Sequence, residues 1–203
     1  SSESIEKVLK IVSSEKRDKV VVLSAFSGVT NLLFEINTLY KNGDTAIAKS
    51  LSLLEDHCLQ VVNPLFKTDS FLQFGKNFIL LKINEIRGLL ELPFHEENTK
   101  KIVAQGELIS TNIFQFFLQE QNVESSLISS LDFMFLDQNN EPNLPLISKK
   151  INSCLDENHS KTYITQGFIC TDCEGNVSNL ERGGSDYTAS LIGAALDVEE
   201  IQI

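Results

Sequence analysis

The stretch that most restricts the fold of this chain is a nearly continuous apolar run, KVVVLSAF, at residues 19–26. A helical pattern precedes it at residues 4–14, and a glycine-bearing turn at residues 27–31 leads to another helical pattern at residues 32–42. A strand that is apolar on both faces must be covered on both faces, unlike an edge strand. The order helix, buried strand, loop, helix therefore predicts an α/β fold.

The rest of the chain repeats this alternation after a long helical segment. Residues 44–97 are helical in pattern, with breaks at Pro64 and Pro93, which indicates an inserted helical hairpin or small bundle. We expect further helices at residues 97–121, 144–158 and 185–196, further strands at residues 123–130, 161–170 and 197–203, and a turn at residues 171–179. This alternation predicts a mainly parallel sheet sandwiched by helices, which binds ligands at the carboxyl ends of its strands. The loops after Leu23 and Ile169 and the start of the last helix are then the expected site.

Composition narrows the classes of function. The chain has 203 residues, 42% of them hydrophobic, and a formal net charge of −11. Such an acidic chain is a poor partner for nucleic acid, whose phosphates need a basic face. No stretch approaches the roughly 20 apolar residues of a membrane span, and residues 1–10 lack the apolar core of a signal peptide. We therefore expect a cytoplasmic protein that binds neither nucleic acid nor membrane.

The cysteines and histidines do not form a clear metal or redox motif. Cys170 and Cys173 are close in sequence and could be half of a zinc site or a redox pair. The stretch CTDCEGN is more typical of a hairpin tip, however, and no second pair of ligands follows it. Cys58, Cys154 and the histidines stand alone in the sequence. We predict no structural metal.

Ser24, Ser27, Gly28 and Thr30 lie in the turn that follows the first predicted strand. Their hydroxyl groups and backbone N–H groups could converge on a polar ligand. Serine and threonine are also preferred at helix N-caps for purely structural reasons. On this segment alone, capping is the simpler interpretation.

Gly106 and Glu107 lie inside the helix predicted at residues 97–121. A glycine in a helix interior costs about 1 kcal/mol relative to alanine, so Gly106 indicates close approach by another backbone or a ligand. Glu107 could then hold an ammonium group, although a glutamate that faces solvent is the simpler interpretation. The apolar positions expected to bury this helix are Ile102, Val103, Ile109, Ile113, Phe114 and Phe117.

The stretch LERGGSDYTASLIGAAL, at residues 180–196, places Arg182, Gly183, Gly184, Ser185 and Asp186 at the start of an amphipathic helix. A helix N-terminus attracts anions because its first N–H groups are unpaired and lie at the positive end of the helix dipole. The glycines allow a ligand close to the backbone, the arginine can bind a carboxylate bidentately, and the serine or the aspartate can cap the helix. This coincidence favours a binding site over a flexible surface loop.

Three motifs together resemble the aspartate kinases of the amino acid kinase family: VVVLSAFSGVTNLL, QGELIS and GFICTDCEGNVSNLERGGSDYTASLIGAAL. They occur in the family's order and approximate spacing, and the resemblance covers nearly the whole chain. It implies ATP-dependent phosphorylation of the side-chain carboxylate of L-aspartate to 4-phospho-L-aspartate, the entry to lysine, threonine and methionine biosynthesis. Mg-ATP and L-aspartate would be the substrates. The parent protein would be a homo-oligomer, and the sequence leaves open whether it is fused to a homoserine dehydrogenase.

Two alternatives to an aspartate kinase remain open at this stage. One is a different amino acid kinase, acting on glutamate or acetylglutamate. The other is an amino-acid-binding module without catalytic activity. The long helical insertion and the segments SAFSGVTN and QGELIS favour the aspartate kinases over the first alternative.

The resemblance also assigns roles to individual positions. Arg182 would bind the α-carboxylate of the substrate, and Glu107 would bind its α-ammonium group. Asp186 would be the acid that organises the catalytic lysines. The remaining positions that would line the aspartate pocket are Ser24, Ala25, Thr30, Phe168, Gly183 and Ser185.

A further implication is that residues 1–203 form part of a catalytic domain. The family's Lys-Phe-Gly-Gly-Thr-Ser loop, which cradles the phosphates, does not occur in this sequence. Neither do the family's C-terminal nucleotide-binding part and its regulatory domains. We therefore expect these residues to hold most of an aspartate pocket and little of the nucleotide site, and to show negligible kinase activity by themselves.

Overall fold

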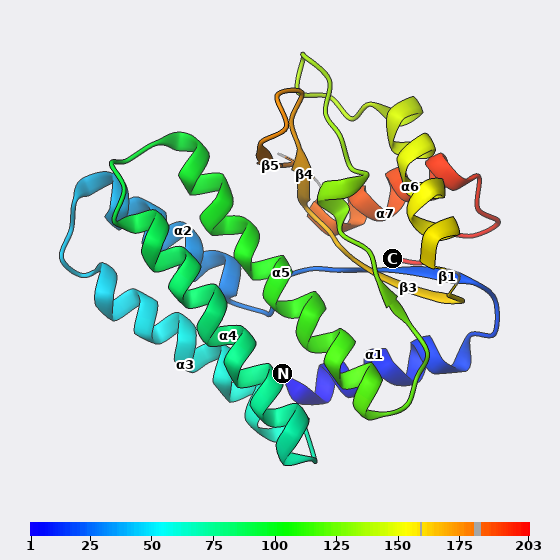
Figure 1. The fold of residues 1–203 in the computed structure, drawn as a ribbon, viewed down its shortest axis with the longest axis horizontal. Helices are drawn as coiled ribbons and strands as arrows, with labels where there is room; N and C mark the ends of the chain where they lie inside the picture. Colours follow the sequence, from blue (N-terminus) through cyan, green and yellow to red (C-terminus); the bar gives the residue numbers. More distant parts are fainter. Residues whose placement is uncertain (159, 181–183) are drawn as a thin grey trace.

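The computed structural model describes residues 1–158, 160–180 and 184–203 and is an α/β structure (Figure 1). Its three-stranded parallel sheet has the order β1-β3-β2 and consists of β1 (Lys19–Leu23), β3 (Thr162–Gln166) and β2 (Ser126–Leu127). The antiparallel strands β4 (Ile169–Thr171) and β5 (Val177–Asn179) form a separate two-stranded ribbon. The predicted fold class is confirmed.

Most of the predicted helices are present, with small changes at their ends. They are α1 (Ser2–Ser14), α2 (Val29–Asn42), α3 (Ile47–Leu65), α4 (Asp69–Leu90), α5 (Glu96–Glu120), α6 (Leu144–Asn158) and α7 (Gly184–Leu196). A short 3-10 helix, η1 (Ser130–Asp132), follows β2. The helical insertion expected at residues 44–97 corresponds to α3 and α4, and α3 continues one residue beyond Pro64.

The two faces of the sheet are covered by different helices, as the apolar run of β1 requires. Val21 and Leu23 pack into the core cluster that contains the buried side of α5. Val20 and Val22 alternate with them and pack into a second cluster, against α6 and α7. Figure 1 shows α1 and α5 on one side of the sheet and α6 and α7 on the other. The predicted sandwich is confirmed.

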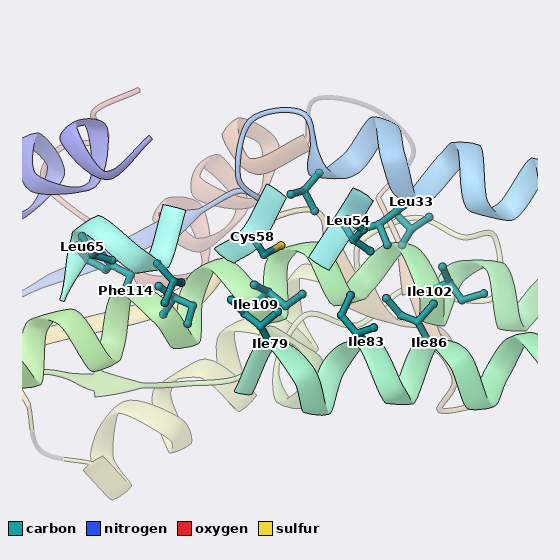
Figure 2. Close-up of a cluster of buried hydrophobic side chains, with 14 of the residues drawn as sticks. Leu33, Leu54, Cys58, Leu65, Ile79, Ile83, Ile86, Ile102, Ile109 and Phe114 are labelled. Atoms are coloured by element: carbon teal, nitrogen blue, oxygen red, sulfur yellow. The ribbon is translucent and has the colours of Figure 1, made fainter. Parts of the chain in front are cut away.

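The larger core cluster extends from one face of the sheet into the space among α2, α3, α4 and α5 (Figure 2). Leu33, Leu54, Ile83 and Ile102 each come from a different one of these helices and are fully buried. The stripe of apolar residues predicted for α5 is also buried along its whole length. Because α5 contributes to this cluster and to the packing of the sheet, it joins the insertion to the rest of the fold.

The prediction of one strand over residues 161–170 is wrong. β3 ends at Gln166 and pairs with β1, whereas β4 starts at Ile169 and pairs with β5. Phe168 lies between them with a φ of 66°, in the left-handed region, which cannot continue a strand. The carboxyl edge of the sheet therefore lies at Gly167 and Phe168 instead of after Ile169.

The hairpin expected at CTDCEGN is confirmed, because β4 and β5 pair around it. The carboxylate of Asp172 accepts hydrogen bonds from the backbone N–H groups of Glu174 and Asn176 and so closes the tip. The turn is shorter than the predicted residues 171–179, because Val177–Asn179 form β5. The predicted strand at residues 123–130 is likewise reduced to the two residues of β2.

The prediction of a strand at residues 197–203 is also wrong. α7 ends where Asp197 adopts a φ of 50°, and the N–H of Val198 donates to the carbonyl oxygen of Gly193 at 3.1 Å. The side chain of Ile201 then lies so close to Gly193 that a Cβ there would overlap it. Contacts with the preceding helix therefore hold this segment in place of strand pairing.

None of the described helices is both long enough and apolar enough to cross a lipid bilayer. The longest of them, α5, has a buried Asn98 and a buried Glu107 among its apolar residues. α5 is buried because other parts of the protein pack against it on several sides.

We expect Ile83→Ala to lower the free energy of unfolding by about 2–5 kcal/mol, because it leaves a cavity in the core among the helices. Leu80→Ala is the matched control in the same helix, since Leu80 is 47% exposed. It should change the free energy by less than about 0.5 kcal/mol. Urea denaturation of both variants measures the difference, and equal losses would contradict the assignment of the buried face of α4.

Candidate functional site

The candidate site lies at the edge of the sheet where β1 and β3 end and α7 begins. The N–H of Gly167 donates to the carbonyl oxygen of Leu23 at 2.8 Å, which holds the ends of the two strands together. A Cβ on Gly167 would overlap the side chain of Ser185 and lie 2.6 Å from its Cα. Gly167 therefore allows the first turn of α7 to pack directly on the end of β3.

Glu107 faces this edge from α5. Its side chain is buried, and its Oε1 accepts a hydrogen bond from the N–H of Ala25 at 3.3 Å. Its other carboxylate oxygen, Oε2, is buried and has no hydrogen-bond partner within residues 1–158, 160–180 and 184–203. The simpler interpretation, a glutamate on a solvent-facing side of the helix, is therefore wrong.

Gly106 explains how the turn after β1 reaches Glu107. A Cβ on Gly106 would lie 3.0 Å from the Cβ of Ala25 and 3.0 Å from Cδ1 of Leu33. The prediction that another backbone or a ligand approaches α5 closely at Gly106 is correct only in the closeness of the approach, because the atoms that approach are side-chain atoms of the β1–α2 turn and of α2.

Burial changes the acidity of Glu107. Removal of the carboxylate from water raises its pKa to about 7, although the hydrogen bond from the Ala25 N–H acts in the opposite direction. The carboxyl group is therefore far more easily protonated than an exposed glutamate. A cation placed beside Oε2 would stabilise the ionised form.

The β1–α2 turn presents backbone N–H groups and hydroxyl groups at the same edge. Ser24 is exposed, and Thr30 is partly buried in the first turn of α2. The N-cap of α2 is Gly28, with a φ of 86°, and no side chain of a described residue caps it by a hydrogen bond. Capping by Ser24, Ser27 or Thr30 therefore does not explain these hydroxyl groups.

The start of α7 is only partly described. Arg182 and Gly183, both assigned to the pocket from the sequence, lie outside the described residues. Ser185 and Asp186 lie in the first turn of the helix, which begins at Gly184, so neither of them is the N-cap. Ser185 is partly buried and Asp186 is exposed.

Sequence reasoning missed Gln166, which is almost fully buried and connects three elements at this edge. Its Nε2 donates to Oγ1 of Thr111 in α5 at 2.9 Å, and its Oε1 accepts from the N–H of Ser130 at 2.8 Å. Thr111 in turn donates to the carbonyl oxygen of Glu107 at 2.8 Å. A glutamine that closes an apolar strand just before a glycine was the signal that could have identified it.

Two grooves on the described surface lie away from the candidate site. A groove of about 510 Å³ lies between α4 and α5, and one of about 430 Å³ lies where α4 and α5 meet β5. No described residue assigned to the candidate site lines either groove. Within residues 1–158, 160–180 and 184–203, no three histidine, cysteine, aspartate or glutamate side chains gather in a way that could hold a metal.

Comparison with known proteins identifies the family. A model of the amino acid kinase family matches residues 1–203. The chain belongs to the amino acid kinase family. The resemblance seen in the three motifs is confirmed at this level, and the parallel sheet between helical layers is the fold of an amino acid kinase.

Curated relatives of this amino acid kinase chain are aspartokinases. Bifunctional aspartokinase/homoserine dehydrogenase 2 of Arabidopsis thaliana is 25% identical over 212 residues, and lysine-sensitive aspartokinase 3 of Escherichia coli is 27% identical over 197 residues. These alignments cover 100% and 95% of this chain but 23% and 43% of the relatives. The chain therefore spans less than half the length of these relatives.

Solved structures agree with the fold. The crystal structure of Escherichia coli aspartokinase III in complex with lysine and aspartate matches with a TM-score of 0.85 at 27% identity, over 97% of this chain and 44% of that one. The structure of the same enzyme with aspartate and ADP matches with a TM-score of 0.82.

We expect Glu107→Gln to remove part of the pH dependence of stability. A raised pKa means that the folded state binds more protons than the unfolded state between pH 4.5 and about 7, so stability falls as pH rises through this window. At pH 8 the variant should be more stable than the wild type by up to about 3 kcal/mol, and at pH 4.5 nearly equal to it. Urea denaturation at both pH values measures this difference.

The matched control is Glu6→Gln, because Glu6 is exposed on α1. This control should keep the pH dependence of the wild type. If the stability of Glu107→Gln has the same pH dependence as that of the wild type, ionisation of Glu107 does not lower the stability of the folded protein.

Gly167→Ala should lower the free energy of unfolding by about 1–3 kcal/mol, because the added Cβ forces α7 away from the end of β3. Gly88→Ala in α4 is the control, since its added Cβ would contact nothing within 4 Å. It should be neutral or stabilising by up to about 1 kcal/mol. Thermal and urea denaturation compare the two, and equal effects would contradict the close packing of Gly167 on Ser185.

Proposed function

We propose that this chain is the amino-acid-binding part of an aspartate kinase, which transfers a phosphoryl group from ATP to the side-chain carboxylate of L-aspartate. The observation that carries the proposal is the buried carboxylate of Glu107: its Oε1 accepts from the Ala25 amide, and no described residue pairs with its Oε2. Buried charges in proteins are paired, and the α-ammonium group of an amino acid supplies the missing opposite charge. Glu107 is therefore assigned to the ammonium end of the substrate.

The α-carboxylate of the substrate is assigned to the start of α7. Arg182 supplies a guanidinium group, which can bind a carboxylate bidentately, and the first turn of a helix favours negative charge. Ser185 packs on Gly167 at the end of β3, so this turn lies at the same sheet edge as Ala25. The backbone at Ala25, Phe168 and Gly183 and the hydroxyl groups of Ser24 and Thr30 complete the proposed pocket.

The reaction needs no strong general base, because the side-chain carboxylate of aspartate is already ionised at pH 7. One of its oxygens attacks the γ-phosphorus of ATP, and the bond from that phosphorus to the β,γ-bridging oxygen breaks. The products are 4-phospho-L-aspartate and ADP. Such a transfer depends on positioning and on neutralisation of the phosphoryl oxygens. Mg-ATP is the second substrate, and Asp186 is assigned to organise the lysines that face it.

The relatives support the same reaction. Those of Arabidopsis thaliana and Escherichia coli are named as aspartokinases, and the Escherichia coli structures contain aspartate in one case with lysine and in the other with ADP. We extend to this chain an amino acid substrate with two carboxylates and a nucleotide as the phosphoryl donor. We also infer that the complete protein is a homo-oligomer.

The test is an acyl phosphate assay on the complete natural protein, with Mg-ATP and with hydroxylamine to trap the product. L-Aspartate should give product, and L-glutamate and N-acetyl-L-glutamate should give none. Glu107→Gln should raise the KM for L-aspartate at least about tenfold and leave the KM for ATP unchanged, because only the ammonium group loses its counter-charge.

Glu6→Gln is again the control, since it removes a carboxylate of the same size from an exposed position. Product from L-glutamate or N-acetyl-L-glutamate alone would identify a different amino acid kinase. Binding of L-aspartate without product from any substrate would identify a binding module and refute the proposed activity.

A further inference from the structure

The turn between β3 and β4 holds a phenylalanine in an unfavourable conformation. Phe168 has a φ of 66°, in the left-handed region that bulky side chains rarely adopt. Two hydrogen bonds hold the backbone of Phe168. Its N–H donates to Oγ1 of Thr188 at 2.9 Å, and its carbonyl oxygen accepts from the N–H of Leu180 at 2.7 Å. Such a conformation persists only where the surroundings enforce it.

The side chain of Thr188 helps to hold Phe168 in this conformation. It is completely buried in the second turn of α7. Its hydroxyl group accepts from the N–H of Phe168 and donates to the carbonyl oxygen of Gly184 at 3.3 Å. The hydroxyl group thus donates its proton within the helix and accepts a hydrogen bond from the turn, and a hydroxyl group can do both at once.

This hydroxyl group connects the two sides of the proposed pocket. On one side is the backbone of Phe168, and on the other is the first turn of α7 with Ser185 and Asp186. Gly167 packs on Ser185 beside it, so a steric contact and a hydrogen bond both act on the distance between the two segments. A small displacement of either segment would misplace a bound substrate.

We propose that Thr188 is a positioning residue for the amino acid substrate. Its hydroxyl group fixes the strained Phe168 turn against the start of α7, and so sets the shape of the pocket at the carboxylate end. The inference rests on the proposed function, and it adds a residue that contacts no substrate itself.

A threonine in a helix often donates to the carbonyl oxygen four residues earlier without any further role. Thr38 in α2 does this, with Oγ1 at 3.0 Å from the carbonyl oxygen of Phe34, and it is exposed. Thr188 differs because its oxygen also accepts a hydrogen bond from another element. Thr38→Val is therefore the matched control, which removes a helical hydroxyl group without touching the pocket.

The experiment compares Thr188→Val, which keeps the shape but lacks the hydroxyl group, with Thr188→Ser, which keeps the hydroxyl group. KM for L-aspartate, KM for ATP and kcat are measured on the complete natural protein. We expect the valine variant to raise the KM for L-aspartate about tenfold or more and to leave the KM for ATP within about twofold. The serine variant should stay within about threefold of the wild type, and Thr38→Val should match the wild type.

If the valine variant does not fold, Thr188→Ala and Thr188→Ser give the same comparison, since they differ only by the hydroxyl group. Equal kinetics for the variants with and without the hydroxyl group, or equal rises in both KM values, would overturn the positioning role. A wild type that neither phosphorylates nor binds L-aspartate would overturn the proposed function and this inference with it. An active wild type with an unaffected valine variant would overturn this inference alone.

Discussion

The packing of α5 on two sides is the constraint on which the other parts of the fold depend. Ile102, Ile109 and Ile113 are fully buried, and residues of every turn between them are buried as well. A helix with so little exposed surface cannot shift without opening both the helical core and the layer over the sheet (Figure 2). The β1–α2 turn, the edge of the sheet and the helical insertion are therefore held in fixed relation, and a side chain on α5 at that edge has a defined position.

The buried position of Glu107 on α5 lowers the stability of the folded protein. Its carboxylate is enclosed by packed elements, and burial raises its pKa to about 7 against the opposing effect of the Ala25 hydrogen bond. The other buried polar atoms that lack a partner in the described part of the chain, among them Oγ of Ser130 and Oγ1 of Thr165, belong to neutral groups, which lose less on burial than a charge does. A carboxylate in this position weakens the folded state unless a cation joins it. Local destabilisation of this kind is typical of a binding site and is not expected of a structural residue.

The sequence was sufficient for features that depend on local pattern. The alternation of Val20 and Val21 between two cores follows from the apolar run, and the close approach at Gly106 follows from the cost of glycine in a helix. The break at Phe168 could not be predicted in this way, because the apolar pattern continues through it and the turn depends on Thr188, 20 residues away in sequence. That Oε2 of Glu107 is buried with no partner among the described residues depends on how several elements pack around it, and no local sequence pattern shows this.

The proposed substrate is an anion, and the chain carries a net charge of −11, so the pocket must favour negative charge locally against a repulsive background. At physiological ionic strength, charges more than about 8 Å apart are largely screened, and the nearest groups therefore decide. α2 begins shortly after the end of β1, with no side-chain cap from the described residues and no acidic residue in its first turn, and α7 begins over Gly167 at the end of β3. The N-terminal amides of both helices then lie at one sheet edge, where their partial positive charges add. Among the described residues, Glu107 is the one buried carboxylate, and it lies on α5, on the other side of the sheet from α7 (Figure 1). The proposed pocket therefore places a negative group for the α-ammonium and a positive helix start for the α-carboxylate of the same amino acid.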